Sequence, residues 1–324
     1  MTTVAAITDT LFRAAVAAAV RAPSLHNTQP WRFRWDPGLD AIEVWADRAR
    51  ALPVTDPDGW GLRISCGAAT FNLRLATAAH GQPLRLRWLP SSDRGLLALL
   101  TPDAPRPPTE TEQRLYQAVP LRRSNRAPFR PEPVPLPARA ALVAAAAADD
   151  AWLDLVSGVV PVAAVAEIAN AANRVLCRDP GYLAELTSWT RHGERSDDGV
   201  PAEAGGPTAE PQDLFPQRPF GDRPRMPGHD YEPDPLVAVL GTAGNTSADQ
   251  LRAGHALQRL LLTVTDLRLS ASMLSQPIEV SAAREQLRLA LSRYGTPQMV
   301  LRIGFGDAGP TTPRRPYDQV VQPE

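Results

Sequence analysis

The side chains best suited to bind a polar ligand gather in a thirteen-residue stretch, RAPSLHNTQPWRF, at residues 21–33. Pro23 interrupts the alanine-rich stretch before it, so the backbone must leave a helix there and present Ser24, Asn27 and Gln29 from a loop. Amide side chains both donate and accept hydrogen bonds, and they can match the carbonyl and ring-nitrogen edges of a planar ligand. A turn that only ends a helix and buries its tryptophan would use the same residues, and on residue types alone it is the simpler interpretation.

The densest basic cluster outside the irregular segments is the sequence RRSNR, which supplies Arg122, Ser124 and Arg126. Guanidinium groups bind phosphate in a bidentate manner, and a serine hydroxyl adds a further donor. A second pair of candidates for a phosphate contact, Arg314 and Arg315, lies near the C-terminus. A solvated turn would show the same composition, so the arginines alone leave the choice open.

Composition favours a globular protein whose chemistry comes from a cofactor. The chain has 324 residues, 44% of them hydrophobic, a formal net charge of -1, and arginine at every one of its 34 basic positions. This charge balance gives no reason to expect a nucleic acid or an anionic membrane as partner. Two distant cysteines and five scattered histidines predict no disulfide and no metal site, and they fit a cytoplasmic location. Because no nucleophile and base occur in a recognisable catalytic order, any demanding chemistry is expected to belong to a cofactor.

Helices and strands that could position these residues alternate along the chain. In the first half, hydrophobic spacing predicts helices at residues 9–20 and 60–79 and strands at 32–35, 42–46 and 84–89. Residues 101–109 are rich in proline and are expected to form a linker. In the second half, the same spacing predicts helices at 111–118, 138–148, 162–176, 248–267 and 285–293, and strands at 152–156, 236–240 and 298–305.

Residues 188–235 form a long segment without hydrophobic periodicity, rich in Gly, Pro, Glu and Asp. A segment of this length inside a compact protein is typical either of a disordered insertion or of a lid over a site. Its aromatic residues Phe215, Phe220 and Tyr231 would allow it to dock. The composition leaves both alternatives open.

Two helical segments of the chain resemble each other. GAATFNLRL begins at Gly67 and GHALQRLLL begins at Gly254, an offset of 187 residues. Amphipathic helices often look alike, so the letters alone do not establish a duplication. Each segment, however, is preceded by a predicted strand and followed by another that begins near a proline, and this repeated order favours a duplication.

The two polar stretches together resemble a known family. RRSNRAPFRPEPVP is similar to the N-terminal signature of the FMN-dependent nitroreductases, and APSLHNTQPWRF is similar to the second signature of that family. Their order is reversed here, because the second signature precedes the first by about a hundred residues. Ordinary members of the family are homodimers with FMN at the interface. The reversed order therefore resembles two fused halves that each keep one signature, as in the actinobacterial Acg-type flavoproteins.

This resemblance implies an α+β nitroreductase-like fold of two fused half-domains, each with an antiparallel or mixed sheet packed by helices, that mimics the family homodimer. The implied halves are residues 1–105 and 110–324, with a lid-like insertion at 188–235 inside the second. The resemblance also implies the FMN ligands. Arg122, Ser124 and Arg126 would hold the phosphate, ribityl chain and ring edge; Pro23, Ser24, Asn27 and Gln29 would approach from the other half; Ser272, Met273 and Gln276, in a loop, would lie along the ring; Arg314 or Arg315 would add charge at the phosphate.

The implied function is that of an NAD(P)H-dependent flavin oxidoreductase acting on a small electron-poor acceptor. In that scheme the flavin carries the chemistry and no catalytic side chain is required. A monomer that imitates a dimer is expected. The alternative is an FMN-storing protein with little reductase activity, in which the insertion keeps nicotinamide away from the flavin.

Overall fold

The structure is a computed structural model of the chain, and it describes residues 7–193, 196–208, 210, 213–221, 235–307 and 309–322. One four-stranded antiparallel sheet belongs to the N-terminal part. Its strands are β1 (Trp31–Asp36), β2 (Ala41–Ala46), β3 (Leu84–Trp88) and β4 (Leu96–Pro102), in the order β1-β2-β4-β3. Side chains along β1 alternate: Trp31 and Phe33 are buried, and the arginine that follows each of them is half-buried. This alternation is expected for a sheet with one face on a core.

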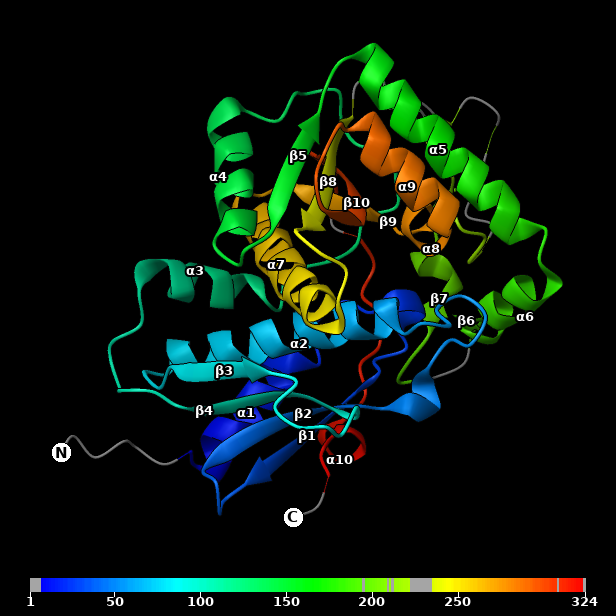
Figure 1. Cartoon of the computed structure of the whole chain (residues 1–324). Helices are drawn as coiled ribbons and strands as arrows, with labels where there is room; N and C mark the ends of the chain where they lie inside the picture. The colour runs from blue at the N-terminus through cyan, green and yellow to red at the C-terminus, as the bar shows by residue number, and fades with distance from the viewer. Residues whose placement is uncertain are drawn as a thin grey trace.

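A second four-stranded antiparallel sheet belongs to the C-terminal part. It contains β5 (Trp152–Val156), β8 (Leu236–Thr242), β9 (Ser270–Leu274) and β10 (Thr296–Gly304), in the order β5-β8-β10-β9. Each sheet is therefore built as two strands, a long helix and two more strands, and the same relative strand order recurs (Figure 1). The predicted fold class, α+β with antiparallel sheets packed by helices, is confirmed.

The long helices α2 (Trp60–Ala79) and α7 (Ser247–Asp266) cross at the centre of the molecule (Figure 1). A Cβ atom on Gly67 would collide with the carbonyl oxygen of Leu251, and one on Gly254 would collide with the carbonyl oxygen of Ile64. The two glycines and the two carbonyls are each 187 residues apart, so equivalent positions meet reciprocally, as in an isologous dimer contact. The repeated sequence segment thus marks the place where the two halves touch.

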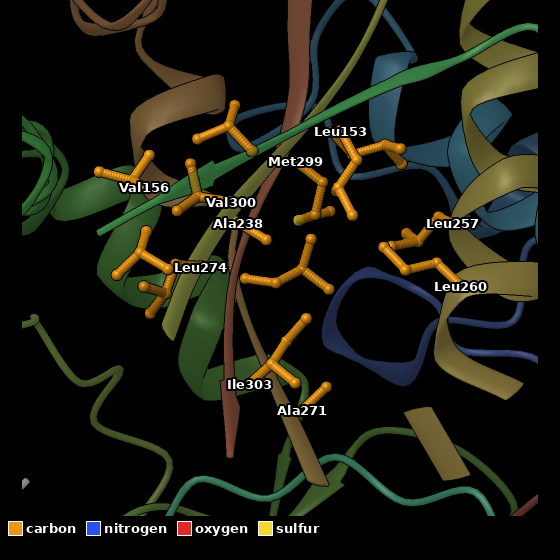
Figure 2. Packing of buried hydrophobic residues seen from close by; sticks show 14 of the residues in the cluster. Leu153, Val156, Ala238, Leu257, Leu260, Ala271, Leu274, Met299, Val300 and Ile303 are labelled. Carbon is orange, nitrogen blue, oxygen red and sulfur yellow. The ribbon is translucent and has the colours of Figure 1, made fainter. Parts of the chain in front are cut away.

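A hydrophobic cluster lies between each sheet and its long helix. Figure 2 shows members of the C-terminal cluster: Leu153, Ala238, Val300 and Ile303 from the sheet, with Leu257 and Leu260 from α7. Leu260 is fully buried, so its replacement by alanine would cost about 2–5 kcal/mol. These clusters make the central helices and the sheets a rigid support for the loops between them.

The shorter helices cover the outer faces and the ends of the sheets. They are α1 (Asp9–Ala19), α3 (Glu110–Ala118), α4 (Leu136–Ala147), α5 (Val159–Cys177), α6 (Pro180–Ser188), α8 (Gln276–Glu279), α9 (Ser281–Ala290) and α10 (Tyr317–Val320). Among the described residues, α5 is the one helix long and apolar enough to cross a membrane by length and composition. Its buried residues, Val162, Val165 and Ala166 among them, pack into the C-terminal core.

Two sequence expectations were wrong in their details. The linker expected at residues 101–109 begins inside strand β4, whose last residue, Pro102, lies at a strand end where a missing N–H group is tolerated. The loop expected at residues 272–276 is the end of β9 followed by the start of α8.

The segment at residues 188–235 has packed structure in its described part. It begins at the last residue of α6 and includes the short parallel strands β6 (Thr190–Arg191) and β7 (Val200–Pro201) and one 3₁₀ turn, η3 (Ala202–Ala204). Tyr182 and Leu186 of α6 form a small buried cluster with Phe220 of the segment. Tyr231 lies outside the described residues, and the proposed domain limits at 105, 110, 188 and 235 stay predictions.

Candidate functional site

A cavity lies where the loop after α1, the first turns of α2, the end of β9 and the insertion meet. Its volume is about 820 Å³, counting the part open to solvent. Seven of the twelve residues expected to bind a cofactor line it: Pro23, Ser24, Ser124, Arg126, Ser272, Met273 and Gln276. Residues from both halves of the chain therefore meet at one cavity.

The loop after α1 is held in an uncommon backbone conformation. His26, Asn27 and Gln29 have φ values of 50°, 54° and 51°. These values lie in the left-handed region of backbone conformation, which residues other than glycine rarely adopt. Ser24 stabilises the loop, because its Oγ accepts a hydrogen bond of 2.9 Å from the backbone N–H of Gln29. Backbone strain of this kind is concentrated at functional sites in proteins.

Asn27 and Gln29 do not line the cavity. Asn27 Nδ2 donates to the carbonyl oxygen of Gly199 at 2.8 Å, and Gln29 Nε2 donates to that of Asp197 at 2.8 Å. Gln29 Oε1 accepts from the backbone N–H of Arg315 at 2.9 Å. Both amides thus connect the loop to the insertion and the C-terminal tail, and their role as cofactor ligands stays a prediction.

Several cavity side chains have hydrogen-bonding capacity that the described part of the chain does not use. Ser124, Ser272 and Gln276 line the cavity, and their side chains make no hydrogen bond to any described residue. Ser124 lies beside β9 because the N–H of Asn125 donates to the carbonyl oxygen of Ala271 at 3.0 Å. These groups are available to the oxygen and nitrogen atoms of a ligand.

Among the described residues, Arg126 has one hydrogen-bond acceptor, the carbonyl oxygen of Ala204, 2.8 Å from its Nη1. Its guanidinium carbon also lies 5.1 Å from the ring centroid of Phe220, which is within the range of a cation–π interaction. Burial, and then the charge of Arg218, lower its pKa to about 10, so it remains charged at neutral pH.

A second group of cations, the buried Arg122 and the half-buried Arg314, has no counter-ion among the described residues. Arg122 is 5% exposed, and within the same part of the chain its Nε and Nη1 have no hydrogen-bond partner, nor does the buried Nε of Arg314. Burial, and then the charges of neighbouring arginines, lower the pKa of Arg122 to about 10 and that of Arg314 to about 9. A buried charge without a partner is strongly unfavourable, so the arrangement is suited to a bound anion.

The sequence left open which of Arg314 and Arg315 could reach a phosphate. Arg315 is engaged by the protein, because its Nη1 lies 3.3 Å from Asp47 Oδ2 and 3.1 Å from the carbonyl oxygen of Gln29. Nη1 of Arg314, by contrast, donates to Asn27 Oδ1 at 3.0 Å and has no acidic partner among the described residues. Arg314 is therefore the better placed of the two for an anion. Neither arginine, nor Arg122, lines the 820 Å³ cavity itself.

The insertion closes one side of the cavity through Arg218. Its guanidinium forms a buried ion pair with Glu279 and donates to Tyr182 Oη at 2.5 Å and Ser275 Oγ at 2.9 Å. Burial is the largest single influence and lowers the pKa of Arg218, but the charges of Glu279 and Tyr182 and the hydrogen bond to Glu279 together raise it by more, so the net shift is upward. Gln217 adds a contact of 3.4 Å from its Nε2 to the carbonyl oxygen of Arg126. The insertion thus contacts both signature segments.

His26 and Glu279 were not predicted as site residues. Nε2 of His26 lies 3.2 Å from Nη1 of Arg218, and its ring meets that of Phe220 edge to face at 5.8 Å. Burial, and then the charges of Arg218 and Arg126, hold the pKa of His26 well below its usual value, so the imidazole is neutral. His26 lay within the stretch singled out in the sequence, whereas no sequence signal pointed to Glu279.

Comparison with known proteins places the chain among its relatives. It is 35% identical over 326 residues to Rv3131 of Mycobacterium tuberculosis (strain H37Rv), a protein that carries the name NAD(P)H nitroreductase; the match covers 96% of this chain and 90% of that one. The chain belongs to the nitroreductase family. A second member of the family with the same type of name, the acg protein of that organism, is 32% identical over 325 residues, or 97% of this chain and 96% of its own.

The structure of the chain was also compared with solved structures. The FMN-dependent nitroreductase NfnB from Mycobacterium smegmatis, in complex with NADPH, superposes with a TM-score of 0.41 at 20% identity, over 65% of this chain and 98% of that chain. No family model matches the sequence.

Proposed function

We propose that this chain binds FMN and uses NAD(P)H to reduce a small electron-poor acceptor. One observation carries the proposal: two arginines without an anionic partner among the described residues, Arg122 and Arg314, belong or bond to segments that line a cavity with unused hydrogen-bond donors. The phosphate of a flavin mononucleotide would balance the charge of the two arginines, and its polar planar ring would bond to the donors of the cavity. The two M. tuberculosis relatives, which are named NAD(P)H nitroreductases, support the same choice.

The residues present fit this cofactor. Arg122 and Arg314 would hold the phosphate through charge-assisted hydrogen bonds. Ser124 and Arg126 would hold the ribityl chain and a ring edge. Ser272, Met273 and Gln276 would lie along the ring, Pro23 and Ser24 would approach it from the other half, and Asn27 and Gln29 would keep their loop in its strained conformation.

The flavin, when bound, supplies hydride transfer. The chain would have three tasks around it. Arg126 would hold positive charge beside the flavin, in a site partly closed to water. Ser272 and Gln276 would orient the ring by hydrogen bonding. Phe220 and Arg218 of the insertion would restrict the space left in the cavity, which would favour small acceptors.

We further propose a cytoplasmic monomer that imitates a dimer. The reciprocal contact of Gly67 and Gly254 supports the imitation of a dimer, because one chain supplies both sides of a pseudo-symmetric interface. The free thiols of Cys66 and Cys177 support the cytoplasmic location, since unpaired cysteines suit a reducing compartment.

FMN titration of the Arg126→Ala variant, with Arg139→Ala as the matched control, tests the assignment of the cavity. Arg139 lies on α4, and within the part of the chain that the structure describes its side chain donates only to the carbonyl oxygen of Val134. Loss of a charge-assisted contact costs about 1.5–3 kcal/mol, so Arg126→Ala should weaken FMN binding by roughly 10- to 150-fold. Equal FMN affinity of the two variants would contradict the proposal.

A further inference from the structure

The imidazole of His26 carries an N–H group that no described residue accepts. Its Nε2 lies 3.2 Å from Nη1 of Arg218. A guanidinium has only donor groups, so Nε2 must be the acceptor in this contact. Since a neutral imidazole has one proton, that proton lies on Nδ1. Nδ1 is buried and has no hydrogen-bond partner within the described part of the chain, so this donor is available to a ligand.

The ring of His26 is held at the wall of the 820 Å³ cavity, which it lines together with Arg218 and Phe220 of the insertion. The edge-to-face contact with Phe220, at 5.8 Å between ring centroids, and the bond to Arg218 hold the imidazole from two directions. The residue is 4% exposed, so its orientation depends on these protein contacts and not on water. A side chain fixed in this way is pre-organised to bind a ligand atom.

Arg218 makes His26 a stronger donor. Its guanidinium donates to Nε2 of the imidazole, while the buried carboxylate of Glu279 holds the guanidinium in place. Hydrogen bonds in a chain polarise one another, so a cation that donates to Nε2 draws electron density from the ring and strengthens Nδ1–H as a donor. The ring itself stays neutral, because a proton on Nε2 would face the guanidinium N–H group. In some enzymes a neutral imidazole of this kind polarises a carbonyl oxygen.

We propose that the Nδ1–H group of His26 binds the conjugated oxygen of the acceptor and stabilises the negative charge that reduction brings to it. The inference rests on the proposed function and deepens it, because it names the acceptors as quinones and nitroaromatic compounds, whose reduction places charge on oxygen. A quinone gains a hydride and then a proton from water, and the reduced cofactor that gives the hydride is oxidised. His26 keeps its proton throughout and acts by hydrogen bonding alone.

Reoxidation of the FMN-loaded protein after its reduction with dithionite tests this role without depending on NADPH. We expect His26→Leu to slow reoxidation by p-benzoquinone roughly tenfold or more, because the loss of one donor to a developing oxyanion costs at least that much. Ferricyanide takes up one electron and no hydrogen, so its rate should not change. His26→Gln keeps an N–H donor and should restore part of the quinone rate. The FMN affinity of both variants should equal that of the unmodified protein.

The matched control is His80→Leu, at the exposed residue that ends α2 at the far end from Trp60, and it should change neither rate. Equal slowing with p-benzoquinone and ferricyanide would overturn the proposal. A loss of FMN affinity in His26→Gln would overturn it as well, because it would assign the donor to the flavin.

Nitrogen NMR of the unmodified protein, labelled with ¹⁵N-histidine, is the second measurement and does not depend on the folding of a variant carrying leucine. At pH 7 the signals of His26, identified by their loss in His26→Gln, should be those of a neutral ring with its proton on Nδ1. Nitrobenzene added to the oxidised FMN-loaded protein should shift the Nδ1 proton signal. A charged ring, or a proton on Nε2, would overturn the proposal. Failure of the unmodified chain to bind FMN would contradict the proposed function itself, and the tautomer of His26 would still be read in that protein.

Discussion

Replacing Arg122 by methionine should make the flavin-free protein more stable and its cofactor binding weaker. Arg122 is 5% exposed, and two nitrogen atoms of its guanidinium have no hydrogen-bond partner among the residues that the structure describes. Its pKa is lowered to about 10, because burial and the neighbouring arginines disfavour the charged form. Since a pKa unit corresponds to about 1.4 kcal/mol, the charged group costs the folded state roughly 3 kcal/mol.

The sign of this effect follows from the direction of the pKa change. A base whose pKa is lowered by folding destabilises the folded state wherever the unfolded chain keeps it protonated, which covers all pH values below about 10. Methionine has a similar length and no charge. The flavin-free Arg122→Met variant should therefore gain about 1–3 kcal/mol in free energy of unfolding at pH 7, measured by urea denaturation.

The same substitution removes a charge-assisted contact to the phosphate. That loss costs about 1.5–3 kcal/mol, so FMN should bind roughly 10- to 150-fold more weakly, and saturating FMN should raise the melting temperature less than in the unmodified protein. Arg139→Met is the matched control and should change neither quantity by much. A destabilised flavin-free variant with unchanged FMN affinity would refute the assignment of Arg122.

Three further perturbations test the fold and the closed insertion. Gly254→Ala should destabilise the protein by about 3 kcal/mol or more in thermal unfolding, because the new methyl group meets backbone of α2, whereas Gly38→Ala in an exposed turn should change it by less than 0.5 kcal/mol. Burial raises the pKa of the Asp56 carboxyl to about 6, so its contribution to the stability of the fold is present below pH 4 and is lost as pH rises through 6. Asp56→Asn should remove up to about 3 kcal/mol of this pH dependence of the free energy of unfolding. An unchanged profile of stability against pH would contradict this. Arg218→Met leaves Glu279 buried without its partner, at a cost of about 3–5 kcal/mol, and should therefore speed limited proteolysis of the insertion. Adding Glu279→Gln to this variant should restore part of the protection. Equal proteolysis rates in the unmodified protein and both variants would argue against this ion pair as the closing contact.

The sequence predicted the central helix well and one strand poorly, for different physical reasons. The helix at residues 60–79 has a continuous apolar periodicity with glycines beside both ends, and the structure reproduces its limits. Strand β4 was missed because its residues LLALL lack the alternation that marks a half-buried strand. Strand β4 lies between β2 and β3, and its pairing with β2 joins residues more than 50 positions apart in the sequence. Local sequence patterns contain no information on a pairing over that distance.

The candidate site was predictable in its segments but not in the direction of each side chain. Both signature stretches meet at one cavity, as the resemblance implied, yet Asn27 and Gln29 bond to the backbone of the insertion instead. A polar residue type shows that a side chain can bond, whereas its partner depends on tertiary structure. The ion pair of Arg218 and Glu279 joins residues 61 positions apart, and no local pattern marks it.

The visible spectrum of the purified protein, recorded anaerobically before and after addition of NADPH, tests the central proposal most directly. The proposal predicts a yellow protein whose absorption near 450 nm, the position expected for a flavin, disappears on addition of NADPH and returns when an electron-poor acceptor such as a nitroaromatic compound is added. A yellow protein whose spectrum does not change with NADPH would contradict the reductase and agree with storage of the flavin. A colourless protein that ignores added FMN would contradict the flavin site as a whole.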